Sequence, residues 1–200
     1  MRRLAAIFAL ALIAGCFDEP VPARDTVPEG SRVYLSDRGL TDLSSVREEF
    51  KAGEKIDYVN LDRNALETFP LELVSFTGLK WLRLNSNRLA QLPADFANLK
   101  SLRRIYLRDN RFTSVPEALK DLPRLTDIDL SGNPVTEVPE WLAAKKGLEA
   151  LSFSRTAIKK LPADLSAWRS LKQLQLGDLS LTAEEMARIR KALPKTAIVF

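Results

Sequence analysis

The sequence has no histidine and a single cysteine, Cys16, among its 200 residues. Without histidine the chain cannot build a catalytic triad that uses a histidine base, the usual zinc sites or a histidine pH switch. One cysteine cannot form a disulfide within the chain. We therefore expect no metal site, no cofactor and none of the common enzyme classes.

The chain also lacks a strong charge of either sign and a long apolar run. Its 30 basic and 26 acidic residues nearly balance, and 46% of its residues are hydrophobic, which is enough for one folded domain with a core. Removal of Arg2 and Arg3 with an N-terminal signal would leave 28 basic residues against 26. This balance gives no electrostatic argument for a nucleic-acid partner.

The N-terminal stretch MRRLAAIFALALIAGC has the layout of a bacterial export signal, with two arginines before an apolar run that ends near Cys16. The run is too short for a permanent membrane span, which needs about 20 residues. Ile13-Ala14-Gly15-Cys16 resembles the lipobox of bacterial lipoproteins. The resemblance implies that residues 1–15 are a signal peptide and that Cys16 carries the lipid anchor. The alternative is an ordinary buried or free cysteine inside a signal or anchor segment.

Residues 16–30 then comprise the lipidated cysteine and a flexible tether, because FDEPVPARDTVPEG is rich in proline and charge and has no apolar period. We expect an exported protein of the bacterial cell envelope that is held at a membrane by lipid. Asp18, in the second place after the cysteine, resembles an inner-membrane retention signal of enteric bacteria, but the choice between inner and outer membrane stays open.

One pattern recurs every 23 residues from Ile56 onward. Its copies read IDYVNLDRNALETFP, LKWLRLNSNRLAQLP, LRRIYLRDNRFTSVP, LTDIDLSGNPVTEVP and LEALSFSRTAIKKLP, followed by the shorter LKQLQLGDLSL from Leu171. They resemble the leucine-rich repeat, LxxLxLxxNxLxxLP, over nearly all of residues 31–200. The resemblance implies an α/β solenoid with a concave parallel β-sheet, short helical or 3-10 returns on the convex side and helical caps at both ends.

The spacing has a physical basis that does not depend on the family. Leucines two apart on a strand point into a core that stacked coils share, and proline suits the first helical position of each return. Asparagines recur at one position of four coils, where their amides can satisfy turn backbone groups of adjacent coils: Asn64, Asn87, Asn110 and Asn133. Thr156 and Leu179 take that position later, so we expect the asparagine series to end there.

The domain at 31–200 divides into a capping coil at 31–55, repeats at 56–181 and a second cap at 182–200. In the first cap Val33 aligns with Val59. In the second, Thr182 and Glu185 form a capping box that opens a helix, Pro194 stops it, and TAIVF finishes the chain as a strand. Such caps hide the open core and the free strand edge of a solenoid.

Side chains between the paired leucines point away from the core, and equivalent ones form columns across the concave sheet. The first coils place aromatic residues and arginines there, next to two acids, and the last coils place small polar residues. Trp, Tyr and Arg are the types most enriched at binding hot spots. We take the following as the candidate partner-binding set, exposed on this face: Tyr58, Trp81, Arg83, Arg104, Tyr106, Arg108, Asp127 and Asp129.

These residues favour a monomeric, membrane-tethered, non-catalytic module that binds a protein or peptide. Three alternatives stay open. The cluster could satisfy itself, with Arg83 over Tyr106, and Arg104 and Arg108 paired with Asp127 and Asp129. The rings could stack on an envelope polysaccharide or a peptidoglycan fragment. Asp127 and Asp129 lie about 6.6 Å apart on one strand face, a spacing that a carboxylate-dependent hydrolase could use. Exposed acids beside arginines should stay ionised, however, whereas an acid catalyst needs a raised pKa.

Overall fold

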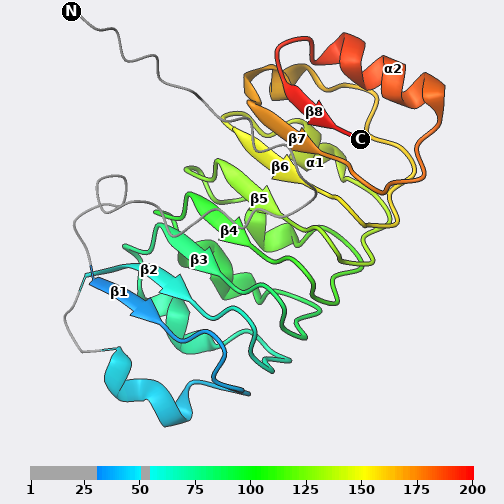
Figure 1. Ribbon diagram of the computed structural model, residues 1–200. Helices are drawn as coiled ribbons and strands as arrows, with labels where there is room; N and C mark the ends of the chain where they lie inside the picture. The colour runs from blue at the N-terminus through cyan, green and yellow to red at the C-terminus, as the bar shows by residue number, and fades with distance from the viewer. Residues whose placement is uncertain (1–30, 51–54) are drawn as a thin grey trace, which may run out of the picture.

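The computed structural model describes residues 31–50 and 55–200, which form a stack of coils with one strand in each coil, from the N-terminal coil at the lower left to the C-terminal coil at the upper right (Figure 1). The expected signal peptide, Cys16 and tether lie outside the described residues. The strands make one parallel sheet of eight, in sequence order. They are β1 (Ser31–Tyr34), β2 (Ile56–Asn60), β3 (Trp81–Arg83), β4 (Arg104–Tyr106), β5 (Asp127–Asp129), β6 (Ala150–Ser152), β7 (Gln173–Gln175) and β8 (Ala197–Val199).

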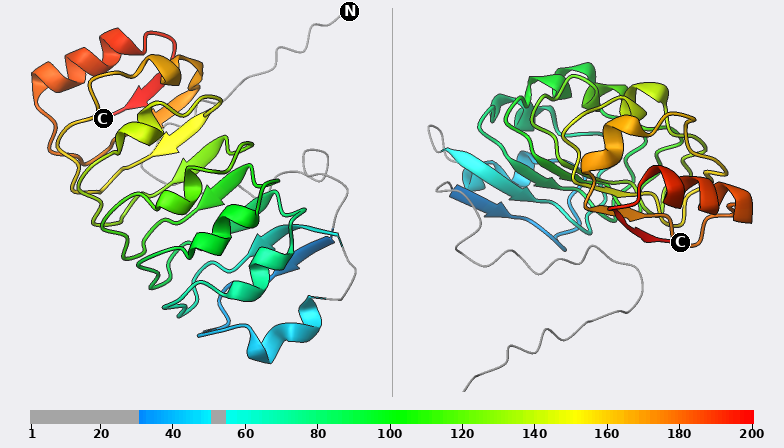
Figure 2. Two further views of the ribbon diagram at one scale, coloured as in Figure 1. Left: turned by 180° about the vertical axis from the view of Figure 1, so that it is seen from behind. Right: turned by 90° about the horizontal axis from the view of Figure 1, so that it is seen from above.

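Short helical segments cover the opposite side of the coils, which the view from behind shows in front of the strands (Figure 2). Most are single 3-10 turns, as the leucine-rich repeat spacing implies. They are η2 (Ser44–Glu49), η3 (Leu71–Ser75), η4 (Ala94–Asn98), η5 (Glu117–Leu119), α1 (Glu140–Ala143), η6 (Ser166–Ser170) and the ten-residue α2 (Ala183–Ala192). The predicted α/β solenoid is confirmed.

The prolines lie one position earlier than expected. Pro70, Pro93, Pro116 and Pro139 have extended backbone angles and are the N-caps of η3, η4, η5 and α1. Their carbonyls accept the first bond of each turn, as Leu73 N–H donates to Pro70 O at 3.1 Å. At the fifth position η6 starts only at Ser166, after Leu165, so Pro162 does not open a helix.

The core is a continuous stack of the paired leucines and their partners from the helical side. Leu82, Leu84, Leu107 and Leu130 are fully buried, and each such side chain contributes about 1.5 to 3 kcal/mol. Phe153, which replaces a strand leucine, is also fully buried in the same core. The core therefore accepts an aromatic ring at this position.

The asparagine prediction is confirmed. Asn110 Nδ2 donates to Leu107 O of its own coil and to Leu84 O of the preceding coil, both at 2.9 Å, and Asn110 Oδ1 accepts from Leu89 N–H at 3.0 Å. Asn64, Asn87 and Asn133 repeat these contacts. The Thr156 hydroxyl donates to Phe153 O of its own coil and makes no bond to another coil among the described residues. The inter-coil bond is lost there because the hydroxyl is too short to span two coils.

Both ends carry caps. The first coil holds η2, a 3-10 helix kinked at Val46, and Val33 pairs with Val59 as predicted. At the other end, Thr182 caps α2 by accepting from Glu185 N–H at 3.2 Å. The second half of the capping box is absent, because the Glu185 carboxylate accepts from Leu161 N–H and Arg188 instead. It thereby joins α2 to the preceding coil, and β8 pairs with β7 as the last strand.

Candidate functional site: the concave face

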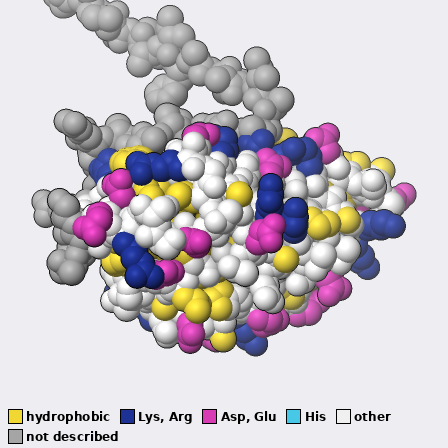
Figure 3. Space-filling view, turned by 90° about the horizontal axis from the view of Figure 1, so that it is seen from below, with side chains coloured by type: hydrophobic (Ala, Val, Ile, Leu, Met, Phe, Trp, Pro, Cys, Tyr) yellow, Lys and Arg dark blue, Asp and Glu magenta, His cyan; other side chains and the backbone are white. Residues whose placement is uncertain are grey.

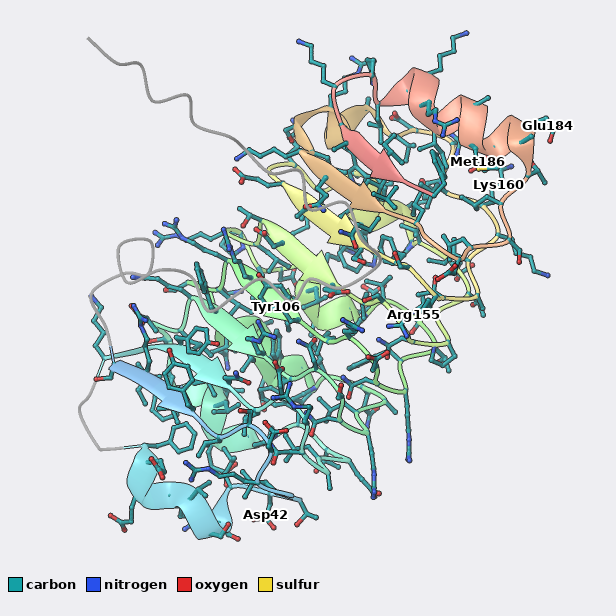
Figure 4. The ribbon with its side chains drawn as sticks, in the orientation of Figure 1. Asp42, Tyr106, Arg155, Lys160, Glu184 and Met186 are labelled. Carbon is teal, nitrogen blue, oxygen red and sulfur yellow. The ribbon has the colours of Figure 1, made fainter. Side chains whose placement is uncertain are left out.

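The strand register places the predicted outward residues in columns. The first column runs Arg32, Tyr58, Trp81, Arg104, Asp127, Ala150, Gln173, and the second runs Tyr34, Asn60, Arg83, Tyr106, Asp129, Ser152, Gln175. All eight candidate residues lie on or next to β2 to β5, and Tyr106 lies on the sheet midway along the solenoid (Figure 4). The structure brings them together on one surface, which we call the concave face.

The expected exposure of this set is wrong for half of it. Tyr58, Trp81, Tyr106 and Asp129 are buried, with 1 to 7% of their surface accessible, while Arg83, Arg104, Arg108 and Asp127 are partly buried. The aromatic residues do not belong to the leucine core on the other side of the sheet. Part of the reason for their burial is that strands about 4.8 Å apart bring long neighbouring side chains into mutual contact.

Aromatic rings and guanidinium groups alternate along the face. Tyr34 and Tyr58 have ring centroids 5.2 Å apart, and the Tyr58 ring meets Trp81 edge-on at 6.2 Å. Arg104 Cζ lies 4.4 Å from the centroid of the Trp81 ring, and Arg83 Cζ lies 5.3 Å from that of Tyr106. Such cation–π contacts contribute about 0.5 to 2 kcal/mol each. The predicted contact of Arg83 with Tyr106 is confirmed.

Each arginine of the set also pairs with a carboxylate. Arg83 Nε donates to Asp62 Oδ2 at 2.6 Å, Arg104 Nε lies 3.7 Å from Asp127 Oδ1, and Arg108 Nε lies 3.1 Å from Asp109 Oδ2. The predicted pairing of Arg104 with Asp127 is confirmed. Arg108 forms its ion pair with Asp109, whereas the prediction paired it with Asp129.

The pair of Arg83 with Asp62 is the least exposed of the three, with 11% and 2% of the side chains accessible. Burial by itself would lower the pKa of Arg83, but the charge and hydrogen bond of Asp62 hold that pKa above its usual value. Tyr58 lies in the same part of the face, and burial raises the pKa of its hydroxyl to about 12. Both groups therefore keep their usual protonation state over any physiological pH.

A second hydrogen-bond series runs along the concave face, and sequence reasoning missed it. Asp62 Oδ1 accepts from Asn85 N–H of the next coil at 2.8 Å, and Asn85 Oδ1 accepts from Arg108 N–H at 2.9 Å. Farther along, Ser154 Oγ accepts from Gly177 N–H at 3.1 Å. The signal in the sequence was an acceptor side chain at one position of successive 23-residue repeats. The exceptions at that position are Arg108, which has no acceptor atom, and Gly177 in the last repeat, which has no side chain.

Asp129 replaces the missing acceptor. Its Oδ1 accepts from Ser131 N–H at 2.9 Å and from Ser131 Oγ at 2.5 Å, much as Asn60 Oδ1 accepts from Asp62 N–H at 2.9 Å. Burial raises the pKa of Asp129 above its ordinary value, although the bonds from Ser131 and the charge of Arg108 oppose this. The expectation that both acids are exposed and readily ionised is therefore wrong for Asp129.

The fold and its relatives agree. A sequence model of the family described as leucine rich repeat matches residues 77–135. A solved structure of a leucine-rich repeat protein from Leptospira interrogans is 29% identical with a TM-score of 0.69, covering 84% of this chain and 48% of that one. The chain is a leucine-rich repeat protein.

A structure of an internalin from Listeria monocytogenes supports the same fold, at 19% identity and a TM-score of 0.58, covering 72% of this chain and 47% of that one. This leucine-rich repeat protein thus spans about half the length of those two chains. No curated protein matches it. The fold suggests a protein-binding module, and its relatives in this family are generally non-catalytic.

Among the residues that the structure describes, no group of three or more His, Cys, Asp or Glu side chains could hold a metal ion. No helix in residues 31–50 or 55–200 is long and apolar enough to cross a membrane. Seen from below, basic and acidic side chains are interspersed with small hydrophobic patches (Figure 3).

Proposed function

We propose that this protein is a non-catalytic, monomeric module that binds a protein or peptide ligand across its concave face. The observation that carries the proposal is the ladder of aromatic rings and arginines from Tyr34 to Tyr106. Tyr34 and Arg104 keep 42% and 29% accessible surface on this ladder, and Tyr and Arg are enriched at binding hot spots. The other end of the face carries small residues such as Ala150 and Ser152, which would give room to a ligand.

Mutual satisfaction within the ladder is a weaker account of it. Arg104 retains 29% of its side-chain surface and its ion pair with Asp127 is long, at 3.7 Å. Partly exposed pairs of this kind contribute about 0 to 1 kcal/mol to stability, which is too little to explain why so many large side chains stand in register. Tyr34, at the end of the ladder, is 42% exposed and is one of the few large hydrophobic residues in the described coils with that much accessible surface.

A polysaccharide or peptidoglycan fragment is the second ligand class, and the geometry favours it less. Sugar binding by stacking requires an open ring face. The Trp81 ring carries Arg104 over it, the Tyr106 ring carries Arg83, and Tyr58 is fully buried. A hydrolase is favoured still less, because the Asp129 carboxyl is held by Ser131 beneath the surface and cannot readily protonate a bond on the solvent side.

We further propose that lipid on Cys16 tethers the module to a membrane in the bacterial cell envelope. The support is the sequence of residues 1–16 and its resemblance to lipoprotein signals. Mass spectrometry of the mature N-terminus tests it: we expect an acylated Cys16, and Cys16→Ser should leave the protein unlipidated. A mature chain that starts at another residue would contradict the tether.

The binding proposal is tested with Arg104→Gln and Tyr34→Ala, because both residues keep accessible surface. Trp81→Ala is a poorer choice, since loss of a buried ring also lowers stability. Arg88→Gln is the matched control: Arg88 pairs with Glu67 at 3.4 Å outside the strands. Ligands captured from envelope extract are identified by crosslinking and their affinities measured by calorimetry. We expect the two face variants to bind about tenfold more weakly than wild type and the control to bind with wild-type affinity. Equal affinities in all four proteins would contradict the proposal.

A further inference from the structure

Several polar atoms on the concave face, Tyr58 Oη among them, are buried and have no hydrogen-bond partner among the described residues, and two of these atoms lie on adjacent strands. These two are Asp129 Oδ2 on β5 and Ser152 Oγ on β6, and their residues are register partners. The two residues are 2% and 1% exposed. A buried polar atom without a partner costs about 1 to 3 kcal/mol, so a ligand group that donates hydrogen bonds to these two oxygens would be stabilised there.

The protein has already committed its own groups elsewhere. Both donors of Ser131 go to Asp129 Oδ1, the other oxygen of the carboxylate. The guanidinium groups of Arg83, Arg104 and Arg108 pair with Asp62, Asp127 and Asp109. Of the two carboxylates in the candidate set, Asp127 has an ion pair with Arg104, and Asp129 has none among the described residues.

We propose that Asp129 Oδ2 and Ser152 Oγ form a subsite for a primary ammonium group, the side-chain terminus of a lysine in the bound protein or peptide. This inference rests on the proposed function and names the chemistry of its ligand. An ionised carboxylate only accepts hydrogen bonds, and a serine hydroxyl can accept as well, so two neighbouring acceptors suit a group with three donors.

The burial of the two oxygens points to the same group. A ligand atom that reaches them must pass between the side chains of the face, and an ammonium on a flexible four-carbon stem can do so through rotamer changes alone. A sugar ring would require a wider opening. The positive charge would also offset the cost of keeping the Asp129 carboxylate ionised away from water.

The charges and polar groups around Asp129 define how binding depends on pH. Arg108 and Asp109 act on it with opposite signs, Ser131 donates to it, and its register partners Tyr106 and Ser152 flank it on β4 and β6. A bound ammonium favours the ionised carboxylate, so it lowers the pKa of Asp129. Affinity should therefore rise with pH as Asp129 ionises and level off above its pKa.

The test uses NMR of the full chain with N-acetyl-lysine methylamide as the probe and N-acetyl-norleucine methylamide as the uncharged control. We expect the lysine probe alone to shift the Ser131 and Ser152 amide signals saturably and to lower the pKa read from the Asp129 carboxyl carbon. Asp129→Asn should weaken the lysine probe at least about tenfold, and Ser152→Ala should weaken it by a smaller factor.

Equal responses to the two probes would overturn the proposal, because they would show apolar binding. No response to either would also overturn it, since the oxygens would then hold water only. If Arg104→Gln no longer captures the ligand and the lysine probe causes no shift in the wild type, the subsite proposal fails while the concave face remains the binding site. A responsive lysine probe with unchanged capture in Arg104→Gln and Tyr34→Ala would instead refute the proposed binding ladder.

Discussion

Replacement of Asp129 by asparagine should stabilise the protein at neutral pH. The carboxylate is 2% exposed, keeps one oxygen without a partner and has a pKa raised mainly by burial. In Asp129→Asn the side-chain oxygen can still accept from Ser131, as Asn60 does for Asp62 at the equivalent position. The new amide group can donate to the hydroxyl of Ser152, its register partner, which satisfies a second buried atom.

The size of the gain follows from linkage between protonation and folding. Each unit by which the native pKa exceeds the unfolded value costs the wild-type protein about 1.4 kcal/mol above the native pKa. Relief of an unpaired buried group adds to this, so we expect a gain on the order of 1 to 3 kcal/mol at pH 7. The gain should be smallest near pH 3, where the carboxyl is protonated in both the folded and the unfolded chain.

The assay is urea unfolding of both proteins at several pH values. Because the native pKa of Asp129 is raised, the free energy of unfolding of the wild type falls as the pH rises from about 4 through that pKa. Asp129→Asn has no carboxyl at this position, so its free energy of unfolding does not fall for this reason. The other acids titrate alike in both proteins, so the difference in free energy of unfolding isolates Asp129. A variant that is less stable than wild type at pH 7, or a difference that does not change with pH, would refute this account of the site.

Three further predictions concern the solenoid. Asn110→Ala should lower the free energy of unfolding by roughly 2 to 4 kcal/mol, because Leu84 O, Leu107 O and Leu89 N–H lose a buried partner; a loss below that measured for the exposed Lys172→Ala would contradict the ladder. Gly132→Ala should destabilise more than Gly147→Ala. Both glycines have positive φ, but a Cβ at Gly132 would overlap the Asp109 carboxylate, whereas one at Gly147 meets nothing within 4 Å; equal melting temperatures would be the opposing result. Glu185→Gln should flatten the acid limb of the stability profile. Hydrogen bonds from Arg188 hold the pKa of Glu185 below its usual value, so the ionised carboxylate stabilises the folded wild type above about pH 4.5 and this stabilisation is lost as the pH falls. The same decrease in the free energy of unfolding at low pH in both proteins would contradict this prediction.

The repeat spacing predicted the fold because each rule acts within one coil or between adjacent coils. Leu82 and Leu84 have to face a shared core, and Asn110 has to reach the turn of the preceding coil, whatever the ligand is. The same logic placed Val33 beside Val59 and paired β8 with β7. In a solenoid, contacts between neighbouring repeats determine most of the structure.

The state of individual side chains on the concave face was harder to predict. Alternation on a strand tells which side of the sheet Trp81 and Asp129 lie on, but it does not tell whether neighbours cover them. The hydrogen bond from Ser131 N–H to Asp129 replaces one that Arg108 cannot accept, because an arginine side chain has no acceptor atom. Pairing of Arg108 with Asp109 depends on side-chain rotamers, which a periodic pattern does not specify.

Site-specific photo-crosslinking tests the central claim, that the concave face holds the ligand, most directly. The photoreactive side chain replaces Tyr34 on β1 in one protein and Leu71 in η3, on the helical side, in the other, because both residues are well exposed, at 42% and 54%. We expect a discrete crosslinked partner from Tyr34, weakened by Arg104→Gln, and none from Leu71. The same partner captured from Leu71 but not from Tyr34 would place the binding surface on the convex side and contradict the account.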